Sequence, residues 1–176
     1  LDVLSDLLKH DRSWRLLLVG RQFAPFPSAT GLNYQREFAR RLEEDGLHEH
    51  VEIRGFTTRL EELYEGVGFV LSCSRREGYG VAFAEGVASG AVPILRDWPI
   101  FASLDAAART FSPEWVVQTP AEAAARIRGA STPKTWRAAT DAAQAQIVDM
   151  ASADDTLRRL RSVINVQGSH RDSLDS

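Results

Sequence analysis

Several features are scarce or absent in this sequence, and each absence excludes a class of protein. The single cysteine, Cys73, rules out an intrachain disulfide. There is no basic excess, because 21 Lys and Arg against 24 Asp and Glu give a net charge of −3, whereas proteins that bind phosphate backbones usually carry one. The densest apolar run, Leu16 to Val19, is far too short to cross a bilayer. No signal-peptide pattern is visible at the start of the sequence. No cluster of His, Cys or Asp has the spacing of metal ligands, so we expect no metal.

The composition is that of a globular chain. Hydrophobic residues make up 44% and charged residues 26% of 176 residues, which is room for one domain or a domain with a tail. The sequence starts at Leu1, without Met, already in an amphipathic pattern, so we expect a piece of a longer protein. His48 and His50 flank a predicted loop, where we expect both to be exposed.

Short apolar runs alternate with segments of helical periodicity. We expect strands at 15–20, 51–53, 67–72, 91–95 and 115–117. We expect helices at about 1–10, 30–45, 60–64, 81–89 and 120–128. This alternation predicts an α/β fold, a Rossmann-like doubly wound parallel sheet, over residues 1–130. The remainder predicts a helical extension over 131–166, with a second helix from Ser152, and a flexible tail over 167–176.

The segment 72–90 carries the most information about function. It reads as a strand, a glycine-containing turn and a helix. In open α/β sheets, ligands bind outside the carboxyl ends of the strands, where this turn lies. Gly78 and Gly80 would leave backbone N–H groups unshielded at the start of the helix, an arrangement that suits a phosphate. The alternative is an ordinary tight turn without a ligand.

Glu85 stands in the middle of an otherwise apolar helix, for which we expect burial on nearly all sides, with Phe83, Val87 and Leu71 in the core. A buried carboxylate is costly unless it is paired or hydrogen-bonded. It would therefore form a salt bridge to an arginine, or bind the hydroxyls of a ligand such as a ribose. Glu77 precedes the turn and should face the same crevice, although it also fits a solvated loop charge.

These residues bring the sequence to a known family. Glu77-x7-Glu85, with Gly78-Tyr79-Gly80 between, resembles the Glu-Gly-Phe-Gly…Glu signature of retaining glycosyltransferases of the GT-B fold, family four (glycosyl transferases group 1). Further blocks resemble the same family in the same order, at residues 15–20, 51–56, 60–64 and 88–93. The resemblance covers roughly residues 1–130 and is carried by the order and spacing of the blocks.

The resemblance implies the donor-binding half of an enzyme that moves a sugar from a nucleotide-diphosphate sugar to a glycan or lipid acceptor. It implies a separate N-terminal domain for the acceptor, no cofactor, and no metal. Glu77 would be catalytic and touch the sugar hydroxyls, while the Gly78-Tyr79-Gly80 backbone would line the sugar and diphosphate. Glu85 would bind the ribose and backbone near Arg54 the base edge. We expect a cytoplasmic protein of polysaccharide biosynthesis, with contact at the inner face of the membrane left open.

Two family features are missing before Leu1. The first is a Gly-Arg strand end with a following lysine, which neutralises the diphosphate. Arg21, or Arg75 and Arg76, would substitute for it, although each also fits a surface charge. The second is the first strand in the family's sheet order, 3-2-1-4-5-6. We expect the remaining strands to close up as 3-2-4-5-6, the alternative being an open gap.

Three other functions remain open at this stage. A nucleotide-sugar epimerase of related architecture would share the fold and part of the donor site. A non-catalytic Rossmann-like module would only contact partners. In the last alternative, Glu77 and Glu85 are both purely structural.

Overall fold

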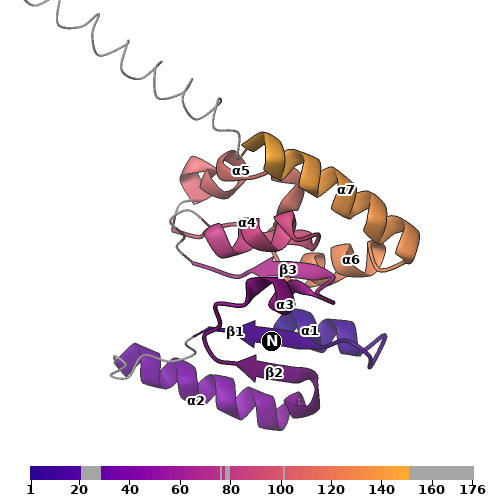
Figure 1. Ribbon diagram of the computed structural model, residues 1–176. Helices are drawn as coiled ribbons and strands as arrows, with labels where there is room; N and C mark the ends of the chain where they lie inside the picture. Colours follow the sequence, from indigo (N-terminus) through magenta and orange to yellow (C-terminus); the bar gives the residue numbers. More distant parts are fainter. Residues whose placement is uncertain (21–28, 76, 78–79, 101, 151–176) are drawn as a thin grey trace, which may run out of the picture.

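Short strands alternate with helices along the described residues, as the sequence predicts. The computed structural model describes residues 1–20, 29–75, 77, 80–100 and 102–150 (Figure 1). The strands are β1 (Leu16–Val19), β2 (Val51–Arg54), β3 (Phe69–Ser72), β4 (Val92–Arg96) and β5 (Val116–Val117). The helices are α1 (Asp2–Leu8), α2 (Ala29–Glu44), α3 (Leu60–Tyr64), α4 (Val81–Ala88), α5 (Ala106–Thr110), α6 (Pro120–Gly129) and α7 (Pro133–Met150). The α/β class is confirmed, whereas the sequence analysis missed α5.

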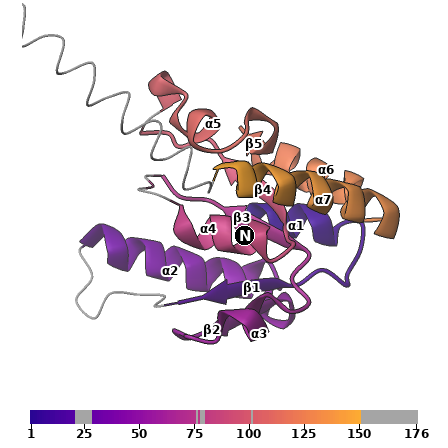
Figure 2. The same cartoon turned by 45° about the horizontal axis from the view of Figure 1, so that its top comes forward.

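The expected helix from Ser152 and the expected tail lie outside the described residues. None of the described helices combines the length and the apolarity that spanning a bilayer requires. Helices α2 and α7 lie toward opposite ends of the molecule in Figure 1 and toward its left and right sides in Figure 2.

The strands form two parallel sheets rather than one. β1 pairs with β2, from Leu16 opposite Val51 to Val19 opposite Arg54, and β3, β4 and β5 form the second sheet in that order. No backbone ladder joins β1 to β3 among the described residues. The expected closure to 3-2-4-5-6 is therefore wrong. Both halves have the internal order that the family implies, but they stay apart, as in the open alternative.

Side chains rather than backbone hydrogen bonds connect the two sheets. The ring of Trp14, just before β1, lies 5.8 Å from the ring of Phe69 at the start of β3, centroid to centroid. Helix α1 packs toward both halves, because Leu7 belongs to a buried cluster with β4 and α6 and Leu4 to another with the end of α2. This packing buries apolar surface without the approach to about 4.8 Å that a shared ladder requires.

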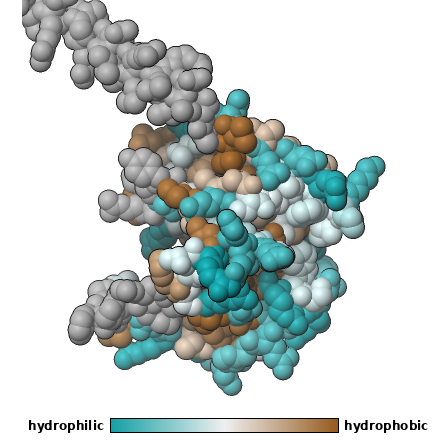
Figure 3. Space-filling view, in the orientation of Figure 1, coloured by the Kyte–Doolittle hydropathy of each residue, from teal (hydrophilic) through white to brown (hydrophobic). Residues whose placement is uncertain are grey.

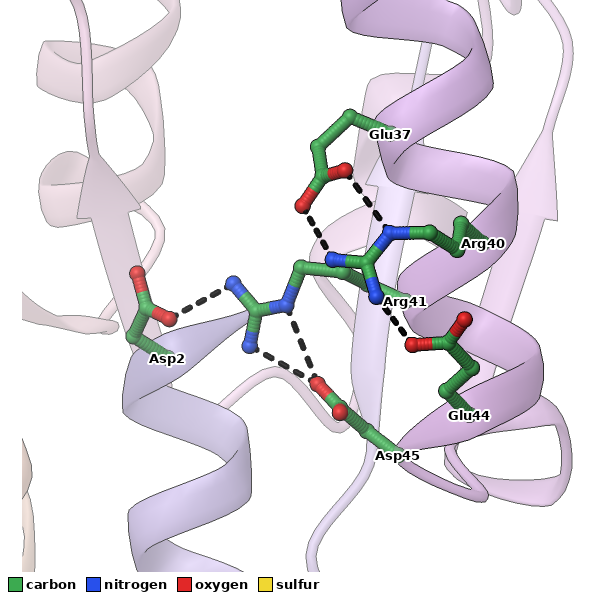
Figure 4. Close-up of polar contacts among 6 residues, drawn as sticks. All are labelled: Asp2, Glu37, Arg40, Arg41, Glu44 and Asp45. Atoms are coloured by element: carbon green, nitrogen blue, oxygen red, sulfur yellow. Dashed lines mark hydrogen bonds and ion pairs between the residues drawn. The ribbon is translucent and has the colours of Figure 1, made fainter.

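An ion-pair network fixes the end of α2 to α1 (Figure 4). The Arg41 guanidinium lies between two carboxylates, 2.6 Å from Asp2 of α1 and 2.8 Å from Asp45 just after α2. Hydrogen bonds to Asp45 and Asp2 raise the pKa of Arg41. On the outer side of α2, Arg40 pairs with carboxylates one turn before and one turn after it. Because exposed ion pairs contribute little stability, we interpret this network mainly as orienting α2.

The core of the second sheet lies between β4 and the helices α4, α5 and α7. Phe83 and Val87 of α4 are buried, as the sequence predicts. Leu71 of β3 is only partly buried and packs against the neighbouring cluster. Burial does not surround α4, contrary to expectation, because Val81 in its first turn is 60% exposed. Helix α4 therefore has one core face and one open face.

Candidate functional site

The candidate site begins where β3 ends and α4 starts. Glu77 is held in this turn: one carboxylate oxygen accepts a hydrogen bond from Ser74 Oγ at 3.1 Å, and the other accepts one from the backbone N–H of Gly80 at 3.3 Å. A negative charge is favourable here because it lies at the N-terminal end of α4, the positive end of the helix dipole. Glu77 is therefore a positioned carboxylate, and the alternative of a solvated loop charge is wrong.

This arrangement also changes the expectation for the glycine turn. The N–H of Gly80 is not unshielded, because the Glu77 carboxylate occupies it. An anion at this end of α4 would have to share the place with a carboxylate of the same sign. A bound diphosphate consequently needs a positive charge nearby.

Gly80 is required by the shape of the turn. It is the N-cap of α4 and has a left-handed backbone, with φ 62° and ψ 33°, which favours glycine. A Cβ atom there would lie 2.7 Å from Cζ of Phe111. The Phe111 ring in turn packs edge-on against Phe83, with centroids 5.0 Å apart. The turn at Gly80 therefore packs directly on the Phe111 ring of the aromatic core.

Gly80→Ala should lower the free energy of unfolding by about 2–5 kcal/mol. A left-handed residue with a Cβ costs about 1–2 kcal/mol, and forcing the methyl group against Phe111 adds about 1–3 kcal/mol. Gly46→Ala is the matched control, because Gly46 has the same φ of 62° but nothing within 4 Å of its Cβ position. Urea unfolding of both variants measures the difference. Equal losses would show that the Phe111 contact does not limit the turn.

Glu85 lies in the middle of α4 and is partly buried. Within the part of the chain that the structure describes, its side chain has no hydrogen-bond or ion-pair partner. The alternative of a salt bridge to an arginine therefore finds no support among these residues. A carboxylate that is partly buried and unpaired retains its capacity to accept hydrogen bonds from a ligand.

Tyr64, at the end of α3, lies close enough to Glu85 to be affected by its charge. Its hydroxyl donates a hydrogen bond to the backbone carbonyl of Ala82 at 2.9 Å. Burial, and to a lesser degree the negative charge of Glu85, raises the pKa of the Tyr64 hydroxyl. The sequence analysis used this tyrosine only to mark a helix, and missed a role for it. Its place in the 60–64 block was the available signal.

Arg54 ends β2 in the other sheet. Its Nε lies 2.5 Å from Oε1 of Glu52, and its backbone carbonyl accepts a hydrogen bond from the N–H of Gly20 at 3.2 Å. Just beyond it, the aromatic ring of Phe56 is 83% exposed. On the face drawn in Figure 3, hydrophobic residues also reach the surface among hydrophilic ones. The structure thus groups Glu77, Gly80 and Glu85 on the β3–α4 unit and places Arg54 at the carboxyl end of the first sheet.

Four of the predicted site residues cannot be placed. Gly78, Tyr79, Arg21 and Arg76 lie outside the described residues. Arg75 is exposed, and its carbonyl lies 3.5 Å from the N–H of Ile100. No ion pair joins the Arg75 side chain to another described residue, so its charge is available at the edge of the turn.

The two histidines differ in their environment. His48 is exposed, as expected, and its Nε2 lies 2.8 Å from Glu43. His50 is buried, contrary to expectation, with Nδ1 2.8 Å from Nη1 of Arg15 and 3.1 Å from the carbonyl of Trp14. The short helical turn at His48–His50 places this ring against Trp14 and Arg15, just before β1. No group of three His, Cys, Asp or Glu side chains among the described residues is arranged to hold a metal ion.

Known proteins are similar to this chain in sequence. The chain is 32% identical over 106 residues to the GDP-mannose:cellobiosyl-diphosphopolyprenol alpha-mannosyltransferase of Xanthomonas oryzae pv. oryzae (strain PXO99A). It is 30% identical to the protein of that name from Xanthomonas campestris. Each match covers 59% of this chain and 26% of the relative. The chain thus corresponds to about a quarter of the length of these proteins.

A likeness in structure supports the fold independently. The crystal structure of TarM superposes with a TM-score of 0.71 over 93% of this chain and 31% of that one, at 18% sequence identity. This likeness confirms the expected α/β domain of the GT-B type. Residues 1–130 match the family described as glycosyl transferases group 1. The chain therefore belongs to the group 1 glycosyl transferases.

Proposed function

We propose that this chain is the donor-binding half of a retaining glycosyltransferase. It would bind a nucleotide-diphosphate sugar at the carboxyl ends of its strands and present the sugar to an acceptor held by another domain. The observation that carries the proposal is Glu85, a partly buried carboxylate without a partner in the described residues, on the helix that Gly80 and Glu77 begin. Membership of the group 1 glycosyl transferases supports the same proposal.

GDP-mannose is the first donor to test. The two curated relatives are named for this donor and for a cellobiosyl-diphosphopolyprenol acceptor, and we propose a similar pair for this chain. An α-linked product formed from the α-linked mannosyl group of GDP-mannose would keep the anomeric configuration, which is what retention means. A donor and a lipid-linked acceptor of this kind would meet at the cytoplasmic face of a membrane during polysaccharide synthesis, and we place the protein there.

We assign the following roles in donor binding. The Glu85 carboxylate accepts hydrogen bonds from the ribose hydroxyls, as paired hydroxyl donors and an unpaired carboxylate are complementary. Backbone at Arg54 meets the base edge, and the exposed ring of Phe56 beside it offers a face for stacking. Glu77 contacts the sugar hydroxyls, and the Gly78-Tyr79 backbone lines the sugar and diphosphate. Residues 1–130 form this binding domain, and 131–166 a helical extension.

Stabilising the leaving diphosphate is the main electrostatic task. When the bond between the sugar and the diphosphate breaks, its electron pair stays on the diphosphate oxygen. We propose that first-turn N–H groups of α4, which lack acceptors within the helix, face that charge. The Glu77 carboxylate at the same end opposes it. Arg21, Arg75 or Arg76 would supply the balancing positive charge, and Arg75 is exposed at the turn.

Glu85→Gln should weaken GDP binding about ten- to hundredfold. A charge-assisted hydrogen bond is worth about 1.5–3 kcal/mol, and the amide keeps the shape of the side chain while removing its charge. Isothermal titration of the 176-residue chain with GDP, UDP and ADP measures the effect. Glu49→Gln is the control, because Glu49 is exposed at the amino end of β2, away from the strand ends that form the site. A variant that binds like the parent but melts several degrees lower would make Glu85 a purely structural residue.

A further inference from the structure

We propose that Tyr64 is a positioning residue that holds the ribose-binding carboxylate of Glu85 at a fixed distance from the base-binding end of β2. The inference rests on the proposed function, because it presumes that Glu85 binds ribose. It assigns to Tyr64 no direct contact with the nucleotide. Three observations carry it: a hydrogen bond, a close packing contact and the connectivity of the two sheets.

The hydrogen bond fixes α3 on α4. The Tyr64 hydroxyl donates to the backbone carbonyl of Ala82 at 2.9 Å. In an α-helix the carbonyl of residue i points along the axis toward the N–H of residue i+4, so the Ala82 carbonyl faces the turn that contains Glu85 and Gly86. The tyrosine hydroxyl therefore lies beside this turn, which agrees with the effect of the Glu85 charge on the pKa of Tyr64.

A close packing contact also holds α4 against Tyr64 next to Glu85. Gly86 follows Glu85, and a Cβ atom there would lie 3.2 Å from Cε1 of Tyr64 and 2.8 Å from Cγ2 of Val70. At Gly86, the only glycine of α4, the helix backbone therefore packs directly between Val70 of β3 and the Tyr64 ring. A shift of the ring would shift α4, and with it the carboxylate of Glu85.

The direction of the hydrogen bond keeps Glu85 available. A tyrosine has one O–H donor, and Tyr64 directs it to Ala82 rather than to the nearby carboxylate. A tyrosine hydroxyl loses its proton only near pH 10, so at neutral pH it keeps its hydrogen and can donate this bond. Tyr64 thus contacts the helix at Ala82 and Gly86, on either side of Glu85, without taking an acceptor site of the carboxylate.

Connectivity makes this contact consequential. The base-binding segment belongs to the β1–β2 sheet and Glu85 to the β3–β4–β5 unit, and no backbone ladder joins the two in the described chain. Helix α3 follows β2 after residues 55–59, whereas α4 follows β3 (Figure 1). Tyr64 therefore bonds the element after the base-binding segment directly to the helix that carries Glu85. It sets the span between base and ribose subsites.

The test separates ribose recognition from general binding. The parent chain is titrated with GDP, UDP and ADP, and the tightest of the three is then compared with its 2′,3′-dideoxy counterpart. The ratio of the two dissociation constants reports the contribution of the ribose hydroxyls. It is measured for the parent, Tyr64→Phe and Glu85→Gln. Tyr34→Phe is the matched control, because the Tyr34 side chain is 68% exposed on α2.

We expect Glu85→Gln to abolish the preference for the hydroxylated nucleotide and Tyr64→Phe to reduce it by at least about threefold, with Tyr34→Phe unchanged. If Tyr64→Phe lowers both affinities equally, or neither, while Glu85→Gln removes the preference, the positioning role is wrong and the proposed ribose site stands. If the parent binds none of the three nucleotides, or Glu85→Gln keeps the preference, the ribose site and the inference fail together.

Discussion

Phe83→Ala should lower the free energy of unfolding by about 3–5 kcal/mol, the usual cost of removing a buried phenylalanine ring. Phe83 is 5% exposed. Its ring lies 5.0 Å from that of Phe111 and 6.2 Å from that of Trp115, centroid to centroid, in edge-to-face geometry. The loss removes both apolar burial and these aromatic contacts. Such a loss is a large share of the total stability of a small domain.

Chemical denaturation of the variant and the parent measures this loss. Val81→Ala is the control, because Val81 lies on the same helix but is 60% exposed, so its effect should stay within about 0.5 kcal/mol. Phe83 also supports Phe111, which lies under Gly80, so the variant should bind GDP more weakly even under conditions where it remains folded. An unchanged unfolding midpoint for Phe83→Ala would mean that α4 buries a different face.

Local patterns predicted most of the secondary structure. Continuous apolar runs mark β1, β3 and β4, because strands buried in a parallel sheet need apolar side chains on both faces. Helical periodicity marks α1, α2 and α7 for the corresponding reason. Helix α5 (Ala106–Thr110) consists of alanines followed by Arg109 and Thr110, so it lacks the spaced large apolar side chains that mark the equally short α3. His50 was misjudged because a single turn of helix, not visible in the pattern, folds it inward.

The arrangement of the strands was not predictable in the same way. Closure of the sheet would have required β1 and β3 to pair, and nothing in either strand encodes that choice. In place of that pairing, tertiary contacts of Trp14 and the leucines of α1 connect the two halves. Those contacts bring together residues far apart in the sequence, whereas the sequence pattern carries only local information.

In the candidate site, too, the features set by local spacing were predictable, and the contacts that depend on the fold were not. Spacing alone placed Glu77, Gly80 and Glu85 on one strand–turn–helix unit, since the three lie within nine residues of one another. Spacing did not show that Glu77 occupies the Gly80 N–H, because that bond depends on a side-chain rotamer. It also did not reveal Tyr64, whose partner Ala82 lies 18 residues further along the chain.

The 176-residue chain by itself should not transfer sugar at a measurable rate. Transfer requires donor and acceptor in near-attack geometry, an effect worth on the order of 7–11 kcal/mol of the barrier. The chain spans 26% of the length of the curated mannosyltransferases that it resembles, and we propose that the acceptor is bound by another domain. A donor held on one side only gains none of this effect.

The structure also gives two reasons to expect that the isolated chain binds the donor weakly. Side-chain contacts rather than a ladder connect the sheets that carry the two ends of the proposed nucleotide site, so the distance between those ends is set by few groups. The Glu77 carboxylate also faces the proposed diphosphate position.

A radiolabelled GDP-mannose assay with cellobiosyl-diphosphopolyprenol tests the expectation that the isolated chain does not transfer sugar, with the Xanthomonas campestris relative as the positive control. Binding of GDP without transfer is the expected result. Acceptor-dependent turnover by the isolated chain at a rate near that of the relative would refute the two-domain reading, because the near-attack geometry would then arise within this chain.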